Sequence, residues 1–166
     1  MGIANKISAT YKRLPPWGQA VAFVGVGLAA WVIYSRIRGS VRQAQTLRQS
    51  RAMLQSTQND LQRLAKSGVK PSYPEAQYRI WADALFACYA GWGTCNDSGT
   101  WQALKNDADV LKLIEAFGIR TIPSGALNPT PDFTGSLPAV IRDEHNFLMI
   151  DWINRQFEQK KIAYRF

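Results

Sequence analysis

The chain has 166 residues and a formal net charge of +8, which allows one ordinary domain and an appendage. Its charge is unevenly distributed: residues 1–70 hold 11 basic residues and one acidic residue, whereas residues 71–166 hold 9 basic and 11 acidic residues. Two cysteines, Cys88 and Cys95, are too few for the disulfide framework of a small secreted protein. We therefore expect two free thiols in a reducing compartment, with a bond across the short loop between them as the alternative.

An uncharged run of 22 residues, 14–35, separates Arg13 from Arg36. As a helix it would reach about 33 Å, which matches a hydrocarbon core of about 30 Å. No small-residue cleavage site follows it, so we expect a basic segment over residues 1–13 and a retained transmembrane helix over residues 14–36. The arginines after the run favour the cytoplasmic-equivalent side of the membrane for the carboxyl-terminal part.

Two sets of residues in this region are candidates for contacts. Small residues on one face of the run permit close helix packing in lipid, either as self-association or with a partner helix, although glycine and alanine are also simply common in membrane helices. Basic residues after the run indicate contact with anionic lipid headgroups or nucleic acid, and the alternative is a stop-transfer flank. The packing set is Gly18, Ala22, Gly25 and Ala29, and the basic set is Arg36, Arg38, Arg42, Arg48 and Arg51.

A basic stalk helix is expected over residues 37–67, because good helix formers dominate this stretch and it contains no proline. Leu47, Leu54 and Leu61 recur every seven residues, but the other seam positions are polar or small. The sequence therefore predicts a narrow apolar stripe that rests on a partner rather than a coiled coil. Ser67 and Gly68 end the helix, and residues 68–74 form a linker.

Residues 75–166 are expected to form a small all-α domain. The pattern Ser72-Tyr-Pro-Glu75 is typical of a capping box, and the helix that it opens should end near Gly91. Helical spacing predicts the buried side chains of this helix and of a short helix that follows. They are Ile80, Trp81, Ala84, Leu85 and Cys88, and then Trp101 and Leu104.

Asn106 or Asp107 caps a third predicted helix, which ends at Gly118. Residues 121–135 contain three prolines and two glycines and are predicted as an ordered loop. Ser136 then caps a brief helix, Asp143 begins the last helix, and residues 162–166 pack back onto the domain. The predicted core positions are Val110, Leu111, Ile114 and Phe117, then Val140 and Ile141, then Phe147, Leu148, Ile150, Ile153 and Phe157.

The pattern from Ala84 to Thr94, a short helix and then residues 109–118 resemble one repeat of the annexin family. Similar single-repeat helical domains, with a tail like residues 161–166, occur in proteins of Bacteroidota and their phages. The resemblance covers residues 75–166 and implies a calcium site near a phospholipid headgroup, in which Gly91, Gly93 and Thr94 offer carbonyl oxygens and Asp132 a carboxylate. Because Cys95 and Asn96 replace an acidic pair that the family usually has, the alternative is that the glycines only turn the chain.

The other polar candidates have simple structural explanations. His145 has no readable catalytic or metal partner and is expected to be solvated or capping. Trp81, Trp92, Trp101 and Trp152 are expected in the core and at its edges. No phosphate loop, paired-carboxylate geometry or zinc spacing is present in the sequence, so we expect neither an enzyme nor any cofactor besides calcium.

These features predict a single-pass membrane-anchored structural protein that links a bilayer to a larger assembly. Its partners would be the bilayer and other structural proteins along the stalk, and the phage resemblance indicates a virion protein of an internal-membrane bacteriophage. One alternative is a calcium- or lipid-binding module that rebinds membrane. Another is a membrane-perturbing lysis or assembly factor that acts through the small-residue face.

Overall fold

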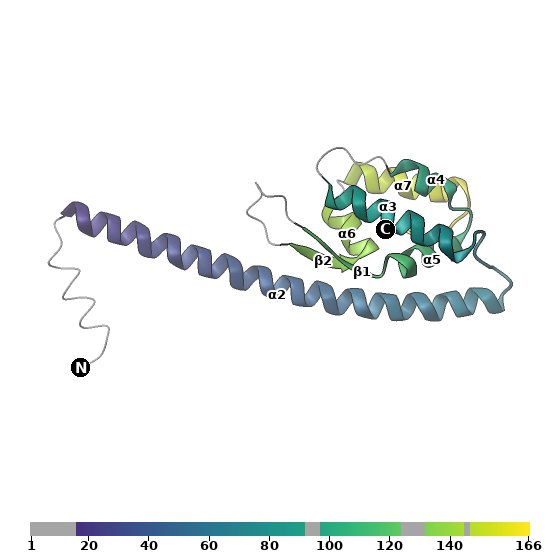
Figure 1. Cartoon of the computed structure of the whole chain (residues 1–166), viewed down its shortest axis with the longest axis horizontal. Helices are drawn as coiled ribbons and strands as arrows, with labels where there is room; N and C mark the ends of the chain where they lie inside the picture. Colours follow the sequence, from purple (N-terminus) through teal and green to yellow (C-terminus); the bar gives the residue numbers. More distant parts are fainter. Residues whose placement is uncertain (1–15, 92–96, 124–131, 145–146) are drawn as a thin grey trace. The chain divides into compact units, whose positions relative to one another are not determined.

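The structure, a computed structural model, describes the backbone of residues 16–91, 97–123, 132–144 and 147–166, and side chains from residue 41 onward within these ranges except residues 144 and 147. The chain forms two compact units, residues 1–42 and 43–166. The elements in chain order are α2 (Pro16–Lys66), α3 (Glu75–Ala90), α4 (Ser98–Ala103), α5 (Asp107–Phe117), β1 (Ile119–Ile122), β2 (Phe133–Ser136), α6 (Leu137–Glu144) and α7 (Phe147–Gln159) (Figure 1).

The predicted stalk helix is confirmed as the carboxyl-terminal part of α2. The helix ends where the sequence indicates, because the amide of Ser67 still donates to the carbonyl of Arg63, at 3.2 Å, and that of Val69 folds back to the carbonyl of Leu64, at 2.9 Å. These two bonds satisfy carbonyls that the end of a helix leaves without partners.

The predicted membrane-spanning helix over residues 14–36 requires correction. In the part of the chain that the structure describes, no helix is long and apolar enough to cross a membrane. From Val41 to Lys66 the side chains of α2 are mostly exposed and polar or charged, and its two buried side chains there are Ser50 and Thr57. The side chains of the proposed packing set (Gly18, Ala22, Gly25 and Ala29) lie outside those described.

The core of the domain forms between α3 and α5, which pack against each other, with α6 against β2 and α5 and with α4 against α7. On α5, Asn106 caps the amino end by accepting a hydrogen bond from the amide of Asp109, at 3.0 Å. Gly118 ends this helix at a φ of +64°, where its amide donates to Ile114 at 3.1 Å, and side chains rarely tolerate such a φ. The predicted α5 core positions, Val110, Leu111, Ile114 and Phe117, are all buried.

The predicted face of α3 is wrong by a partial turn of the helix. Ile80 is 59% exposed and Ala84 is also exposed, although both were expected inside. Leu85 is buried as predicted, and the other buried side chains are Tyr78, Ala82 and Tyr89. The capping box is also wrong, since the residue before the helix is Pro74 and makes no side-chain cap hydrogen bond.

The all-α fold class is wrong because a two-stranded antiparallel sheet lies where a loop was expected. Ile119 pairs with Ser136 and Ile122 with Phe133. Between the strands, the hydroxyl groups of Thr121 and Thr134 lie 3.0 Å apart. The strands have only four residues each, too few for alternation of apolar and polar residues to be read from the sequence.

Gly135 explains how the second strand packs closely against α6. A Cβ atom at this position would lie 2.9 Å from Cε1 of Phe133 and 3.0 Å from Cβ of Ala139, and such distances force neighbouring atoms apart. A residue without a side chain is therefore required here.

The last helices follow the prediction only in part. A brief helix begins directly after Ser136 as expected, but Asp143 lies in the last turn of that helix, α6, and does not begin α7. On α7, Ile153 and Phe157 are buried as predicted, while Leu148 is 61% exposed. The tail over residues 162–166 packs back onto the domain as predicted.

Candidate functional site

Residues 43–66 of α2 lie along the domain, and their inner face combines two buried hydroxyl side chains, Ser50 and Thr57, with half-buried apolar ones. The hydroxyl of Ser50 accepts a hydrogen bond from the amide of Ser136, at 2.9 Å, and the hydroxyl of Ser136 contacts the sulfur of Met53, at 3.7 Å. Leu54 packs against the hydrophobic core, while Leu47 and Leu61 are half-buried. The narrow stripe predicted from these leucines therefore rests on the chain's own domain.

Ser136 belongs to β2, and a second contact joins α2 to the start of the same strand. The side-chain amide of Gln43 donates to the carbonyl of Asp132 and to the hydroxyl of Thr134, both at 3.3 Å. Figure 1 shows β1 and β2 beside this part of α2. The hairpin that the sequence did not predict is thus one of the surfaces that hold the helix.

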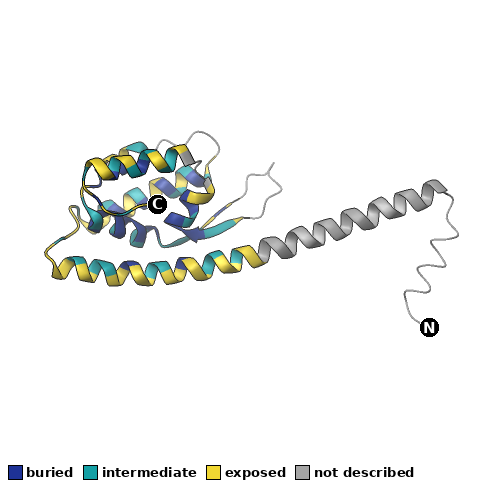
Figure 2. Ribbon diagram, turned by 180° about the vertical axis from the view of Figure 1, so that it is seen from behind, coloured by how far each residue is buried: buried dark blue, intermediate teal, exposed yellow. Residues whose placement is uncertain are grey.

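The opposite side of this helix segment, which we call the outer face, is exposed and basic. In Figure 2 the exposed residues of α2 lie along the side away from the domain. Among the side chains that the structure describes, Arg63 pairs with Asp60 at 3.0 Å, whereas no acidic group pairs with Arg48 or Arg51. The outer face comprises Arg48, Arg51, Gln55, Gln58, Asn59, Gln62, Arg63 and Lys66, all exposed.

Part of this surface was anticipated. Of the predicted basic set, Arg48 and Arg51 lie on the outer face and Arg42 is exposed before it, while the side chains of Arg36 and Arg38 lie outside those described. Arg63 and Lys66 were missed. The signal was in the spacing, because positions 15 and 18 residues after Arg48 return to the same side of a helix.

A buried carboxylate, Asp109, connects three segments of the domain. It is fully buried and accepts hydrogen bonds from the amide of Ser72 at 2.6 Å, the hydroxyl of Tyr78 at 2.6 Å and the amide of Lys105 at 2.8 Å. Burial and the bond to Asp109 raise the pKa of Tyr78 well above its usual range. The bonds fasten the linker after α2 to α3 and α5 and compensate for burying the charge.

Asp97 plays a similar part at the other end of α3. It is 4% exposed, and its Oδ2 atom accepts hydrogen bonds from the hydroxyl of Tyr89 and the indole nitrogen of Trp101, both at 2.7 Å. The two tyrosines face inward on α3 because each finds a buried carboxylate. This pairing is the reason why hydrophobicity alone selects the wrong face of the helix.

The carboxyl-terminal tail is held by polar and aromatic contacts. Oδ1 of Asp107 accepts from the amides of Ala163 and Tyr164, both at 2.8 Å. The side-chain oxygen of Asn154 accepts from the amide of Phe166 at 3.0 Å, and the Phe166 ring lies 5.4 Å from that of Trp101. Burial raises the pKa of Tyr164 to about 12. The side chain of Asp107 therefore anchors the carboxyl-terminal tail, while the side chain of Asn106 caps α5.

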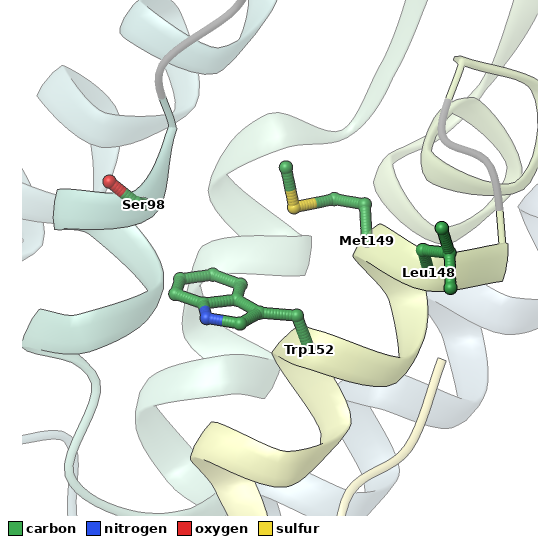
Figure 3. A pocket seen from close by; sticks show the side chains of 4 residues that line it. All are labelled: Ser98, Leu148, Met149 and Trp152. Atoms are coloured by element: carbon green, nitrogen blue, oxygen red, sulfur yellow. The ribbon is translucent and has the colours of Figure 1, made fainter.

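An open apolar pocket of about 310 Å³ lies between α7 and α4. Met149 and Trp152 project from α7 toward the segment that carries Ser98, with Leu148 at the outer side (Figure 3). The lining residues that the structure describes offer apolar surface and one hydroxyl, and none of these four is an acid, a base or a charged group.

The calcium site implied by the annexin resemblance stays a prediction. Gly91 ends α3 and Asp132 precedes β2, while Gly93 and Thr94 lie outside the described residues. Within the ranges that are described, no group of three or more histidine, cysteine, aspartate or glutamate side chains is arranged to hold a metal ion.

Three further expectations concern cysteine, histidine and tryptophan. Cys88 is disulfide-bonded, so the expectation of two free thiols is wrong; a separation of seven residues from the other cysteine, Cys95, makes the loop inexpensive to close. Cys95, His145 and Trp92 lie outside the described residues. Trp101 is buried, and Trp81 and Trp152 pack at the edge of the core, as predicted.

Comparison with known proteins does not identify this chain. No family model, curated protein or solved structure matches it. Its function therefore has to be argued from the geometry described above.

Proposed function

We propose that this protein is a non-enzymatic structural adaptor, in which the domain braces residues 43–66 of α2 so that the outer face docks onto a larger assembly. The observation that supports it is the division of α2 into two sides. The inner side is held by the β1–β2 hairpin through Ser136 and Thr134 of β2, while the outer side is a continuous exposed surface.

The use of the domain's polar groups supports the same role. Asp97, Asp107 and Asp109 accept hydrogen bonds that hold together helices, the linker and the tail. The ammonium group of Lys160 donates to the carbonyls of Trp101 and Leu104 at 3.3 and 3.0 Å. These polar groups of the described residues therefore stabilise the fold.

Isolation of the full chain under mild conditions from its native source tests the proposal. We expect it to sediment with a larger assembly, and a photo-crosslinking residue at Gln55 or Gln62 on the outer face should capture assembly components. The matched control is Arg79 on α3, whose side chain is 69% exposed and should capture several-fold less. A chain that runs as a free 18.6-kDa monomer, with equal crosslinking from both surfaces, would contradict the adaptor role.

A further inference from the structure

We infer that the assembly component bound by the outer face is a nucleic acid, contacted through its phosphate groups. The inference rests on the proposed adaptor role and names the chemistry of its partner. Residues 41–66 contain five basic residues and one acidic residue, a net charge of +4, whereas the domain over residues 71–166 has 9 basic and 11 acidic residues. Positive charge that an anionic partner could use is therefore concentrated on the helix.

The basic residues of the outer face lie on one side of α2. At about 100° per residue, Arg48 and Lys66 are separated by five full turns, and Arg51 and Arg63 lie about 60° to either side of them. The four side chains thus occupy an arc of about 120°, opposite the buried Thr57. Residues as far apart in the sequence as Arg48 and Lys66 share one side only because the helix between them is continuous.

The length of the row fits a phosphate backbone. The 18 residues from Arg48 to Lys66 span about 27 Å along the helix axis, close to the rise of eight base pairs of a duplex. Guanidinium groups bind phosphate oxygens in a bidentate geometry. The amides of Gln55, Asn59 and Gln62 lie between the two basic pairs and are further donors for phosphate and sugar oxygens.

The same face does not suit a bilayer. A helix that lies on a membrane needs large apolar side chains beside its basic ones. Between Arg48 and Lys66, the apolar side chains are turned inward, with Leu54 packed against the core and Met53, Leu61 and Leu64 half-buried. The described exposed side of this segment contains amides, small residues and charges only. The observations therefore favour a nucleic acid over anionic lipid.

Fluorescence anisotropy with the full chain and a labelled random-sequence duplex tests the inference. We expect the chain to bind the duplex. A plot of the logarithm of the association constant against the logarithm of the salt concentration should have a slope of about −3 to −4, as four phosphate contacts require. Arg48→Gln with Arg51→Gln should weaken binding about tenfold and make the slope less negative by about two. Arg63→Gln with Lys66→Gln should do the same.

The matched control removes two exposed charges from the domain, Arg79→Gln with Arg155→Gln, whose side chains are 69% and 71% exposed. It should leave the affinity within about twofold. Equal loss in the control, an unchanged affinity in both outer-face variants, or tighter binding to anionic phosphatidylglycerol vesicles than to the duplex would overturn the inference. If the chain still sediments with its assembly after nuclease treatment, the adaptor role survives and only the nucleic-acid partner is wrong.

Discussion

Helix α5 and residues 43–66 of α2 both pack against the domain, but through different chemistry. On α5 the buried side chains are apolar apart from Asp109, whose carboxylate is satisfied by hydrogen bonds from three segments. On residues 43–66 of α2 the fully buried side chains are Ser50 and Thr57, and Leu54 packs against the core. One helix is part of the core, whereas the other is attached to its surface.

This difference indicates how the molecule separates stability from recognition. Burial of apolar area dominates folding energy, so α5 and its neighbours determine whether the domain exists. A polar seam adds little net free energy but sets register and direction, because a net hydrogen bond contributes about 1 kcal/mol. The contacts that attach α2 therefore determine which side of the helix faces outward, although they contribute little to the stability of the core.

The strongest test of this contrast removes the carboxylate of Asp109. Asp109→Ala leaves the amides of Ser72 and Lys105 and the hydroxyl of Tyr78 without their acceptor, so we expect the free energy of unfolding to fall by about 3–5 kcal/mol. Urea denaturation followed by circular dichroism measures the change. The control Asp151→Ala removes an exposed pair with Arg155 at 2.7 Å and should cost less than about 1 kcal/mol. Equal effects would mean that Asp109 is no more important than a surface charge.

An intermediate effect is expected from pH at Tyr164, a half-buried residue of the carboxyl-terminal tail. Because burial raises the pKa of Tyr164 to about 12, the folded state keeps this proton at pH values where the unfolded state has lost it. The contribution of Tyr164 to the free energy of unfolding is therefore complete below the unfolded pKa of about 10. It is lost as the pH rises toward 12, and the total loss is about 2–3 kcal/mol.

Thermal unfolding of the wild type and of Tyr164→Phe over this alkaline range measures the contribution. The wild type should lose stability more steeply than the variant, and the comparison cancels the other groups that titrate there, including Tyr78. Parallel curves for the two proteins would show that the tail does not bury this hydroxyl in the folded state.

The smallest effect is expected at the seam of α2. Leu54→Ala removes a half-buried contact and should reduce stability by about 1–2 kcal/mol, and Ser50→Ala by about 1 kcal/mol or less. Hydrogen exchange should become faster for residues 43–66 while the amides of α5 stay protected, because the segment detaches locally. Gln55→Ala on the outer face is the control and should change neither region. Loss of protection in α5 together with α2 would show that the two helices unfold as one unit.

Much of the domain could be predicted because it depends on neighbouring residues. Asn106 caps α5 through an amide three residues away, and Gly118 ends the helix through its own positive φ. The apolar period of α5 also matches its buried side. These features need no information from distant parts of the chain, which is why sequence reasoning found them.

The errors arose where distant residues decide the outcome. Tyr78 and Tyr89 turn inward on α3 because their hydroxyl groups donate hydrogen bonds to the carboxylates of Asp109 and Asp97. No local pattern reveals that pairing. The short hairpin likewise depends on pairing between Ile119–Ile122 and Phe133–Ser136. The candidate binding surface was found only in part, because Arg48 and Arg51 follow the uncharged run closely whereas Arg63 and Lys66 join them only along an extended helix.

The sequence by itself determined the concentration of positive charge before residue 71, the long helix that carries part of it, and the cap and the end of α5. These follow from composition, helix propensity and contacts within a few residues. Only the tertiary structure decided which side of α2 is covered, because that depends on Ser136 and Thr134, more than 80 positions away along the chain. Where those residues hold the polar seam, the basic side is left facing outward.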